Sequence, residues 1–175
     1  MIREVHETEQ NNDGEIVAAD LAGQYLTFLL DREIYGIDIL KVQEIVGLLP
    51  VTKVPRTPAH VHGVINLRGN VVPVIQLRAK FGMQSQEDTR KTCIVVVQVA
   101  GASKGIAIGI IVDEVSEVLS IANDQLAPAP EFGSSVDAVF ILGIGKVGDR
   151  DIVLLDIDRV LSWGDLTMTR QAATA

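Results

Sequence analysis

Short runs of aliphatic residues, separated by glycine, proline and charged residues, recur along the chain. They are rich in valine and isoleucine, which favour extended strands packed on at least one face. The strand candidates are Tyr25–Leu30, Ile34–Ile39, Val42–Val46, Val61–Leu67, Val71–Ile75, Thr92–Val99, Gly105–Val112, Val115–Ile121, Ala138–Ile144 and Ile152–Leu155. Many short strands at close spacing indicate an all-β barrel or sandwich fold.

Helices are expected to be brief. Thr57-Pro58 supplies an N-cap followed by proline at the first helical position, which predicts one helical turn through His60. Two further short helices are expected over Leu77–Phe81 and over Ile157–Trp163, the latter capped by Asp156.

One hairpin stands out because two apolar runs, Val61–Leu67 and Val71–Leu77, flank Arg68-Gly69-Asn70. Glycine and asparagine tolerate positive φ, so the pair Gly69-Asn70 predicts a tight turn. This turn presents Asn66 and Arg68 beside a hydrophobic sheet. A guanidinium offers five donors in a rigid fork, which suits a protein carboxylate or carbonyl. We therefore expect another protein to dock here.

The two halves of the chain resemble each other. At an offset of 73 residues, Gly36–Ile45 and Gly109–Val118 share Gly, Ile, Val and Glu, and this match pairs Glu44 with Glu117. At an offset of 80, Val72–Leu77 aligns with Ile152–Ile157. A difference of seven residues in one loop would account for the change. Duplication is the favoured reading, and a shared strand pattern is the alternative.

Charge and size exclude several classes of protein. The net charge is −8, of which residues 1–20 contribute −5 through six acidic residues against Arg3 alone. An acidic chain without a basic patch argues against nucleic-acid binding. The N-terminal segment has neither the basic n-region nor the apolar h-region of a secretory signal. No apolar segment approaches the roughly 20 residues that span a bilayer. The single Cys93 permits no internal disulfide, which fits a reducing compartment.

No set of residues predicts catalysis or a cofactor. Gly143–Gly148 spells G-x-G-x-x-G, but an apolar run rather than a helix follows it, so a glycine-rich hairpin is favoured over a nucleotide site. His60 and His62 lack the further ligands that zinc requires. Cys93 begins an apolar run, which is typical of an inert core thiol, and Ser134-Ser135 have no histidine nearby. We expect a non-enzymatic protein without metal or cofactor.

Four blocks, in order, carry a resemblance to a known family. The segment TPAHVHGVINLRGNVVPVIQLRAKF resembles the central signature of the CheW family of bacterial chemotaxis adaptors. YGIDILKVQEIV, IGIIVDEVSEVLSI and APAPEFG resemble its other recurrent blocks, so that the likeness covers residues 24–163. Gln76 departs from the family, which usually carries Asp there, and this weakens any argument for a cap or ion pair at that position.

The resemblance implies an all-β fold with short helices, built from two five-stranded Src-homology-3-like barrels in tandem around an apolar seam. It places a CheW-like domain at 21–165, with lobes of roughly 21–85 and 90–165 between which an exchange of strands is left open. Residues 1–20 are expected to be a disordered acidic tail, and 166–175 a flexible C-terminal tail.

The implied function is coupling of methyl-accepting chemoreceptors to a CheA-type histidine kinase, in the cytoplasm and at membrane-bound receptor arrays, without membrane insertion. Family positions for receptor or kinase binding match Val42, Glu44, Gly63, Arg68, Gly109, Val115 and Val118, and the hairpin argument adds Asn66. Glu44 could pair with Arg68 at the docking surface or only solvate a strand, and Val115 and Val118 could belong to the core.

Three rival functions stay open at this stage. One is a CheW-like scaffold of a motility or developmental pathway outside chemotaxis. Another is an enzyme that uses the glycine-rich loop, and the third is a fragment of a larger signalling protein. The starting Met and the end of the strand pattern near Trp163 favour an independent protein.

Overall fold

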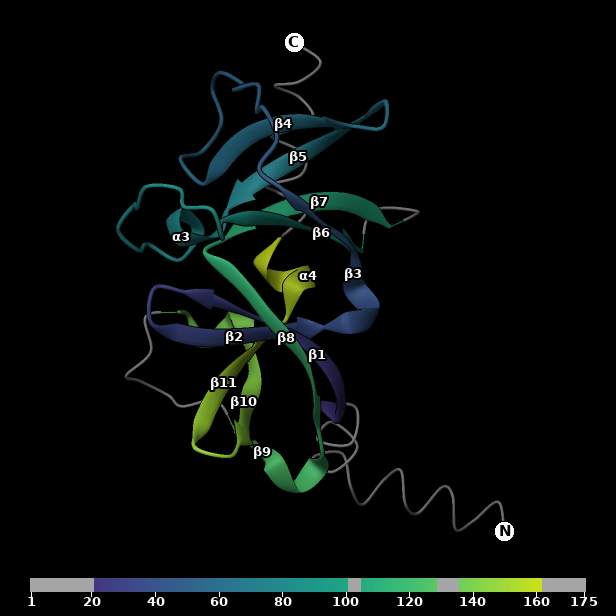
Figure 1. Cartoon of the computed structure of the whole chain (residues 1–175), viewed down its shortest axis with the longest axis vertical. Coiled ribbons are helices and arrows are strands. Elements are labelled where there is room, and N and C mark those ends of the chain that lie inside the picture. Colours follow the sequence, from purple (N-terminus) through teal and green to yellow (C-terminus); the bar gives the residue numbers. More distant parts are fainter. Residues whose placement is uncertain (1–20, 101–104, 129–135, 162–175) are drawn as a thin grey trace, which may run out of the picture.

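The computed structural model describes residues 21–100, 105–128 and 136–161, which are mostly β-strand with only short helices (Figure 1). The strands are β1 (Gly23–Leu30), β2 (Glu33–Asp38), β3 (Val42–Gly47), β4 (Val61–Leu67), β5 (Asn70–Gln76), β6 (Cys93–Val99), β7 (Ile106–Val112), β8 (Glu114–Ile121), β9 (Leu126–Ala127), β10 (Ile141–Val147) and β11 (Arg150–Leu155). The helical turns are η1 (Ile39–Lys41), α3 (Leu77–Lys80), η2 (Asn123–Gln125), η3 (Ala138–Phe140) and α4 (Ile157–Val160). None of these described helices is long and apolar enough to cross a membrane.

The predicted strands are confirmed to within a few residues, with one correction. The strand predicted from Ala138 begins only at Ile141, because Phe140 N–H donates to Asp137 O and closes the 3-10 turn η3.

The short helices are partly as predicted. The turn predicted over 57–60 forms as an isolated turn and not as a helix, since Val61 N–H donates to Pro58 O at 3.0 Å. The predicted cap is absent, because the Thr57 hydroxyl donates back to Val54 O at 2.9 Å instead of accepting from a following N–H. Asp156 does cap α4 by accepting from Arg159 N–H. Gln76 gives α3 no side-chain cap, as its departure from the family pattern suggested.

The strands form two sheets that exchange members. Sheet A has the order β8-β1-β2-β11-β10-β9, and sheet B has the order β3-β6-β7-β5-β4. In Figure 1 sheet B lies above sheet A, and β8 runs from the end of β7 down across β1. Each sheet therefore takes strands from both halves of the chain. Sheet A also carries a sixth, two-residue strand, β9, beyond the expected five.

Strand pairing reproduces the sequence repeat. In sheet A, β2 and β11 pair in parallel with Gly36 opposite Leu154, and in sheet B β7 and β5 pair in parallel with Gly109 opposite Val74. These partners are related by the offsets of 73 and 80 found in the sequence. The same offset of 73 relates β3 to β8, so the exchanged strands are counterparts of each other.

Apolar side chains form three layers. One cluster lies inside each sheet, around Val74 and Ile94 in sheet B and around Tyr25 and Ile152 in sheet A. A larger shared core lies between the sheets and includes α4 (Figure 1). Its members are Leu26, Phe28, Leu30, Tyr35, Ile37, Val61, Ile75, Leu77, Phe81, Val95, Val97, Val99, Ile108, Ile110, Val112, Val136, Ile141, Leu155, Ile157, Val160 and Leu161.

Period-2 alternation explains the layers. On β6, Ile94 and Val96 point into sheet B while Val95 and Val97 point into the shared core. A strand that is buried on both faces reads as the continuous apolar run seen in the sequence. The apolar seam expected between two small barrels is this shared core.

The glycine-rich motif is a hairpin, as expected. Gly143 and Gly145 lie within β10, and Gly148 lies in the turn to β11 with a φ of +63°. A Cβ on Gly145 would stand 2.8 Å from Ile121 Cδ1, so close strand packing explains the absence of a side chain there.

Candidate functional site

The β4–β5 hairpin turns at Arg68-Gly69, one residue earlier than the sequence suggested. Leu67 pairs with Asn70, which leaves Arg68 and Gly69 as the two central residues with φ of +53° and +86°. Positive φ at both positions is what a type I′ turn requires. The Asn66 carboxamide oxygen accepts from Gly69 N–H at 2.9 Å. The prediction of positive φ at Asn70 is therefore wrong, because Asn70 already belongs to the β5 ladder.

Arg68 forms an ion pair with Glu44, through which the two edges of sheet B meet. Glu44 lies on β3, at the opposite edge from β4, so the contact closes the sheet into a barrel. The hydrogen bond from Arg68 lowers the pKa of Glu44, and the same bond raises the pKa of Arg68. The Arg68 side chain nevertheless keeps 67% of its surface exposed, against 22% for Glu44. Glu44 thus holds an arginine that still faces outward.

A groove of about 580 Å³ begins beside Arg68 and runs along sheet B. Its lining combines apolar and amide side chains, and Gln98 Nε2 donates to Gln43 Oε1 at 2.5 Å across it. The lining residues are Gln43, Leu67, Arg68, Asn70, Val71, Val72, Pro73, Gln98, Gly105, Ile106 and Ala107. Of the seven family-derived candidates, only Arg68 lines this groove.

Gly63 and Gly109 serve the packing of sheet B. Gly63 has a φ of +152°, and a Cβ there would stand 2.3 Å from Thr52 O, so no other residue fits without a backbone shift. A Cβ on Gly109 would stand 2.7 Å from Ile94 Cγ2. Both glycines occupy buried strand positions, Gly63 in β4 and Gly109 in β7, which favours a structural role.

The three valines among the candidates lie away from the hairpin. Val42 and Val115 are half-buried and pack against the shared core. Val115 and Val118 sit on β8 in sheet A, opposite Phe28 and Leu26 of β1. Val118 is 46% exposed. The structure therefore brings together Glu44, Asn66 and Arg68, and it leaves Val118 as an exposed candidate on the other sheet.

Sheet A carries a second arginine–glutamate pair that the sequence reasoning missed. Arg150, at the start of β11, lies 3.2 Å from a carboxylate oxygen of Glu117 on the exchanged strand β8. Glu117 is the repeat counterpart of Glu44. Arg68 and Arg150 were not matched in the sequence repeat, because they are 82 residues apart whereas the hairpins are related by an offset of 80.

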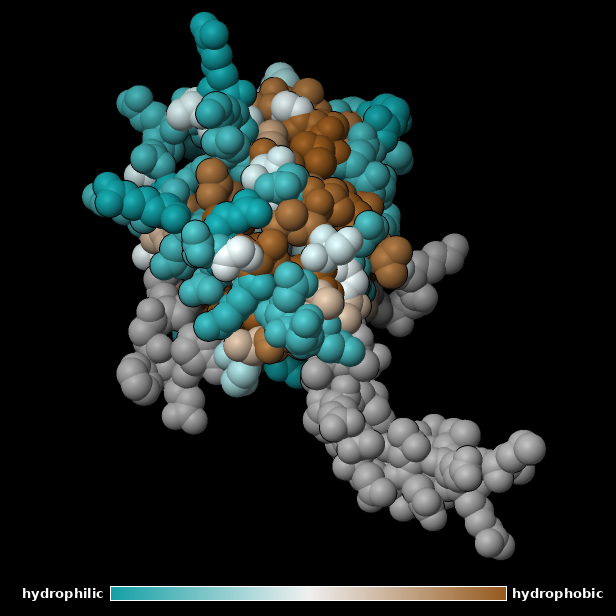
Figure 2. All heavy atoms as spheres, turned by 60° about the horizontal axis from the view of Figure 1, so that its bottom comes forward, coloured by the Kyte–Doolittle hydropathy of each residue, from teal (hydrophilic) through white to brown (hydrophobic). Residues whose placement is uncertain are grey.

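Several large hydrophobic side chains are exposed on the surface of the protein. On the face shown in Figure 2 they gather in a broken band among hydrophilic residues. The large ones exposed over the whole described surface are Leu40, Ile45, Leu48, Val71, Val118, Val139 and Leu142. Apolar residues gathered on a surface are typical of protein–protein contact.

Residues considered for catalysis have ordinary surroundings. Cys93 is half-buried against the shared core, and burial raises the pKa of its thiol, which is typical of an inert cysteine. Within residues 21–100, 105–128 and 136–161, no three His, Cys, Asp or Glu side chains cluster in a way that could hold a metal ion. Ser134-Ser135, most of the APAPEFG block and both tails lie outside the described residues.

This chain is similar in sequence to proteins of one known family. A family model described as the CheW-like domain matches residues 24–165. The Chemotaxis protein CheW of Klebsiella aerogenes is 40% identical over 158 residues, covering 90% of this chain and 93% of that protein. The Chemotaxis protein CheW of Helicobacter pylori is 38% identical over 138 residues, covering 79% and 81%.

A solved structure agrees with the sequence matches. The crystal structure of the scaffolding protein TtCheW from Thermoanaerobacter tengcongensis aligns with a TM-score of 0.73 at 32% identity, covering 83% of this chain and 91% of that one. The matched segment contains both sheets and the Glu44–Arg68 pair. With its fold, its repeat and its family model in agreement, this chain belongs to the CheW family.

Proposed function

We propose that this chain is a chemotaxis adaptor that couples receptors to a CheA-type histidine kinase, and that the hairpin carrying Arg68 is a docking face. The relatives named above are chemotaxis proteins and a scaffolding protein, which supports the adaptor role. The chain acts in the cytoplasm by binding rather than by catalysis, and receptors recruit it to the membrane.

The observation that carries the docking face is the exposure of Arg68. The Arg68 side chain pairs with Glu44 but remains mostly exposed beside an open groove, so much of its guanidinium is still accessible to a partner. Arginine is enriched among the residues that dominate binding energy at protein interfaces. The groove beside it offers the apolar and amide surface that an amphipathic helix can use.

We assign the receptor's helical tip to this face and the kinase's regulatory domain to another. The exposed Val118 on β8 supports a second binding face on sheet A. This face would consist of the exchanged strand β8, with Val115 and Val118 on it. Val42, Gly63 and Gly109 then act through the shape of the barrels instead of by direct contact.

Co-sedimentation with receptor-bearing membranes, with and without the kinase, tests this assignment. Arg68→Asp and Glu44→Lys should each weaken sedimentation about tenfold or more, because each reverses a charge at the hairpin. Arg150→Asp is the matched control on sheet A and should leave receptor binding without kinase unchanged. All variants should give wild-type circular dichroism spectra.

The double variant Glu44→Lys/Arg68→Asp separates docking from support of the fold. It restores an ion pair between β3 and the hairpin but presents the opposite charge to a partner. If Arg68 docks directly, the double variant stays defective. Recovery of sedimentation by the double variant, or wild-type sedimentation by Arg68→Asp alone, would refute the docking role.

A further inference from the structure

The chain crosses between the two sheets at two points in the described residues. From β2 to β3 it passes through the three-residue turn η1, whereas a single residue, Asp113, separates β7 in sheet B from β8 in sheet A. Asp113 is therefore the whole hinge of the second crossing.

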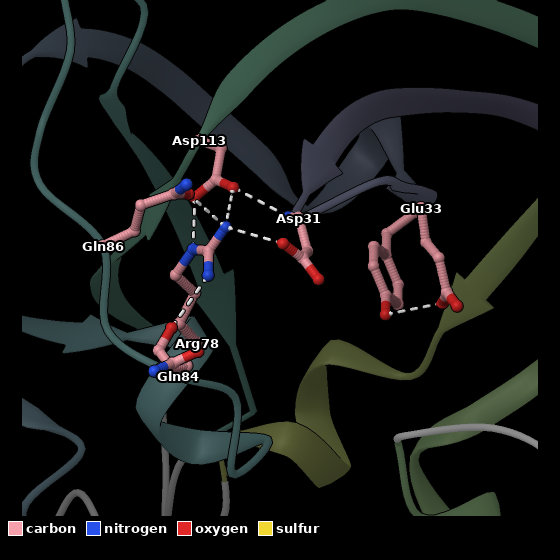
Figure 3. Close-up of polar contacts among 7 residues, drawn as sticks. Asp31, Glu33, Arg78, Gln84, Gln86 and Asp113 are labelled. Atoms are coloured by element: carbon pink, nitrogen blue, oxygen red, sulfur yellow. Dashed lines mark hydrogen bonds and ion pairs between the residues drawn. The ribbon is translucent and has the colours of Figure 1, made fainter.

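Hydrogen bonds hold the hinge on every side (Figure 3). Asp113 N–H donates to Leu29 O at 3.1 Å, and its carboxylate accepts from Asp31 N–H at 2.8 Å. Arg78 donates to the same carboxylate through Nε at 2.8 Å and Nη2 at 2.5 Å, as a bidentate pair.

Arg78 itself is nearly buried, with 6% of its side chain exposed. It donates from Nη1 to Gln84 O at 2.8 Å and from Nη2 to Gln86 Oε1 at 2.5 Å, and Nη2 lies 3.5 Å from Asp31 Oδ1. Arg78 comes from α3, which follows β5 of sheet B, whereas Asp31 lies between β1 and β2 of sheet A. We call Arg78, Asp113 and Asp31 the hinge cluster.

The strand beyond the hinge is held mainly by backbone pairing. Of the eight residues of β8, only Ile121 is buried, and the strand pairs with β1 from Ile121 opposite Gly23 to Glu114 opposite Leu29. The same pairing is available on β1 of any second copy of the chain. A strand with this character can exchange between copies at little cost once its hinge opens.

We propose that the hinge cluster decides whether β8 and the strands after it complete sheet A of their own chain or sheet A of a second copy. If residue 113 straightened, β7 and β8 would form one continuous strand, and residues from 114 onward would pair with β1 and β2 of the other molecule. Closed and exchanged forms share all contacts except those at the hinge. Loss of the hinge cluster therefore penalises the closed form alone.

The test uses a variant that removes both charges of the bidentate pair without leaving either ion unpaired in a buried position. Arg78→Met/Asp113→Asn should raise the dimer association constant about tenfold or more, measured by size-exclusion chromatography with light scattering. Glu117→Gln/Arg150→Met is the matched control, since it removes an arginine–carboxylate pair on the same strand away from the hinge. The control should keep the wild-type oligomeric state.

Engineered cysteines identify the exchanged strand. Gln24 and Ser120 are exposed cross-strand partners on β1 and β8, so Gln24→Cys/Ser120→Cys in a Cys93→Ser background can form a disulfide. In a closed chain the bond is intramolecular, and in an exchanged dimer it joins two chains. On denaturing, non-reducing gels we expect a covalent dimer from the hinge variant and a monomer from the wild type and the control.

A folded hinge variant whose disulfide is only intramolecular would overturn the proposal, as would an equal yield of covalent dimer from the control. Should the double variant fail to fold, the same gels are run on Asp113→Asn alone, which retains an acceptor for Arg78. Absence of a covalent dimer above the wild-type level from that folded variant would also overturn it. These outcomes do not depend on receptor binding, so they are distinct from failure of the adaptor role.

Discussion

At the scale of single residues, Arg68 occupies a backbone conformation that arginine rarely adopts. A positive φ costs an ordinary L-residue about 1 kcal/mol, whereas asparagine followed by glycine is the preferred type I′ sequence. Arg68→Asn should therefore keep or raise the free energy of unfolding, by roughly 0.5 to 1 kcal/mol in urea titrations. If Arg68 docks directly, as proposed, the same variant should also lose receptor binding, because a neutral carboxamide replaces the charged five-donor guanidinium.

The control for this prediction is Arg150→Asn. Arg150 also pairs with a glutamate, but it lies at the start of β11 and its φ is not positive. No gain in stability is expected from that variant. A marked loss of stability in Arg68→Asn would mean that the ion pair with Glu44 outweighs the backbone strain at the turn.

Residue-scale features were predictable where they depend on chain neighbours. The apolar runs around residues 68–70 gave the hairpin, and only the turn position was wrong by one, because strand register decides which pair is central. The contact of Glu44 with Arg68 was one of two alternatives, since it depends on closure of the barrel. The approach of Gly63 to Thr52 and the pair Arg150–Glu117 need the folded chain, and no local pattern encodes them.

At the scale of elements, β-branched runs predicted the strands well because each strand buries at least one face. The predicted helical turn at 57–60 and the early strand start at Ala138 failed for a common reason. In both places a local hydrogen bond to a nearby carbonyl, from the Thr57 hydroxyl or from Phe140 N–H, fixes a turn that propensity does not distinguish from a regular element.

The element β2 offers a test of how tightly the sheets depend on each other. Ile37 is fully buried and belongs to the shared core, not to the interior of sheet A alone. Ile37→Asp buries an ionised group without a partner, at a cost of several kcal/mol. We expect both sheets to lose stability together, as one lowered transition in urea followed by circular dichroism.

The matched variant is Ile45→Asp on β3, where the side chain is 45% exposed. The same chemical change there should alter the free energy of unfolding by about 0.5 kcal/mol or less. A biphasic transition in Ile37→Asp, with half of the β signal lost at low urea, would show that the sheets unfold separately. That result would contradict the role given to the shared core.

At the scale of the whole molecule, the exchange of β3 and β8 joins the two repeats into one folding unit. The sequence repeat predicted two similar lobes, but which sheet receives which strand depends on the two short crossings at η1 and at Asp113. Local hydrophobic patterns are the same for exchanged and unexchanged arrangements, so the exchange could only be left open at that stage.

The crossing at Asp113 also makes stability depend on acidity. Burial acts to raise the pKa of this carboxyl, but hydrogen bonds from Arg78 and the Asp31 amide outweigh it and hold the pKa below its ordinary value. A carboxyl with a lowered folded pKa contributes stability above its unfolded pKa of about 3.9 and loses that contribution as the pH falls through the folded pKa. The free-energy difference between wild type and Asp113→Asn should therefore be largest near neutral pH and shrink below about pH 4. Urea titrations at stepped pH measure it, and a difference that stays constant from pH 7 to pH 3 would show that the Asp113 carboxylate does not stabilise the crossing.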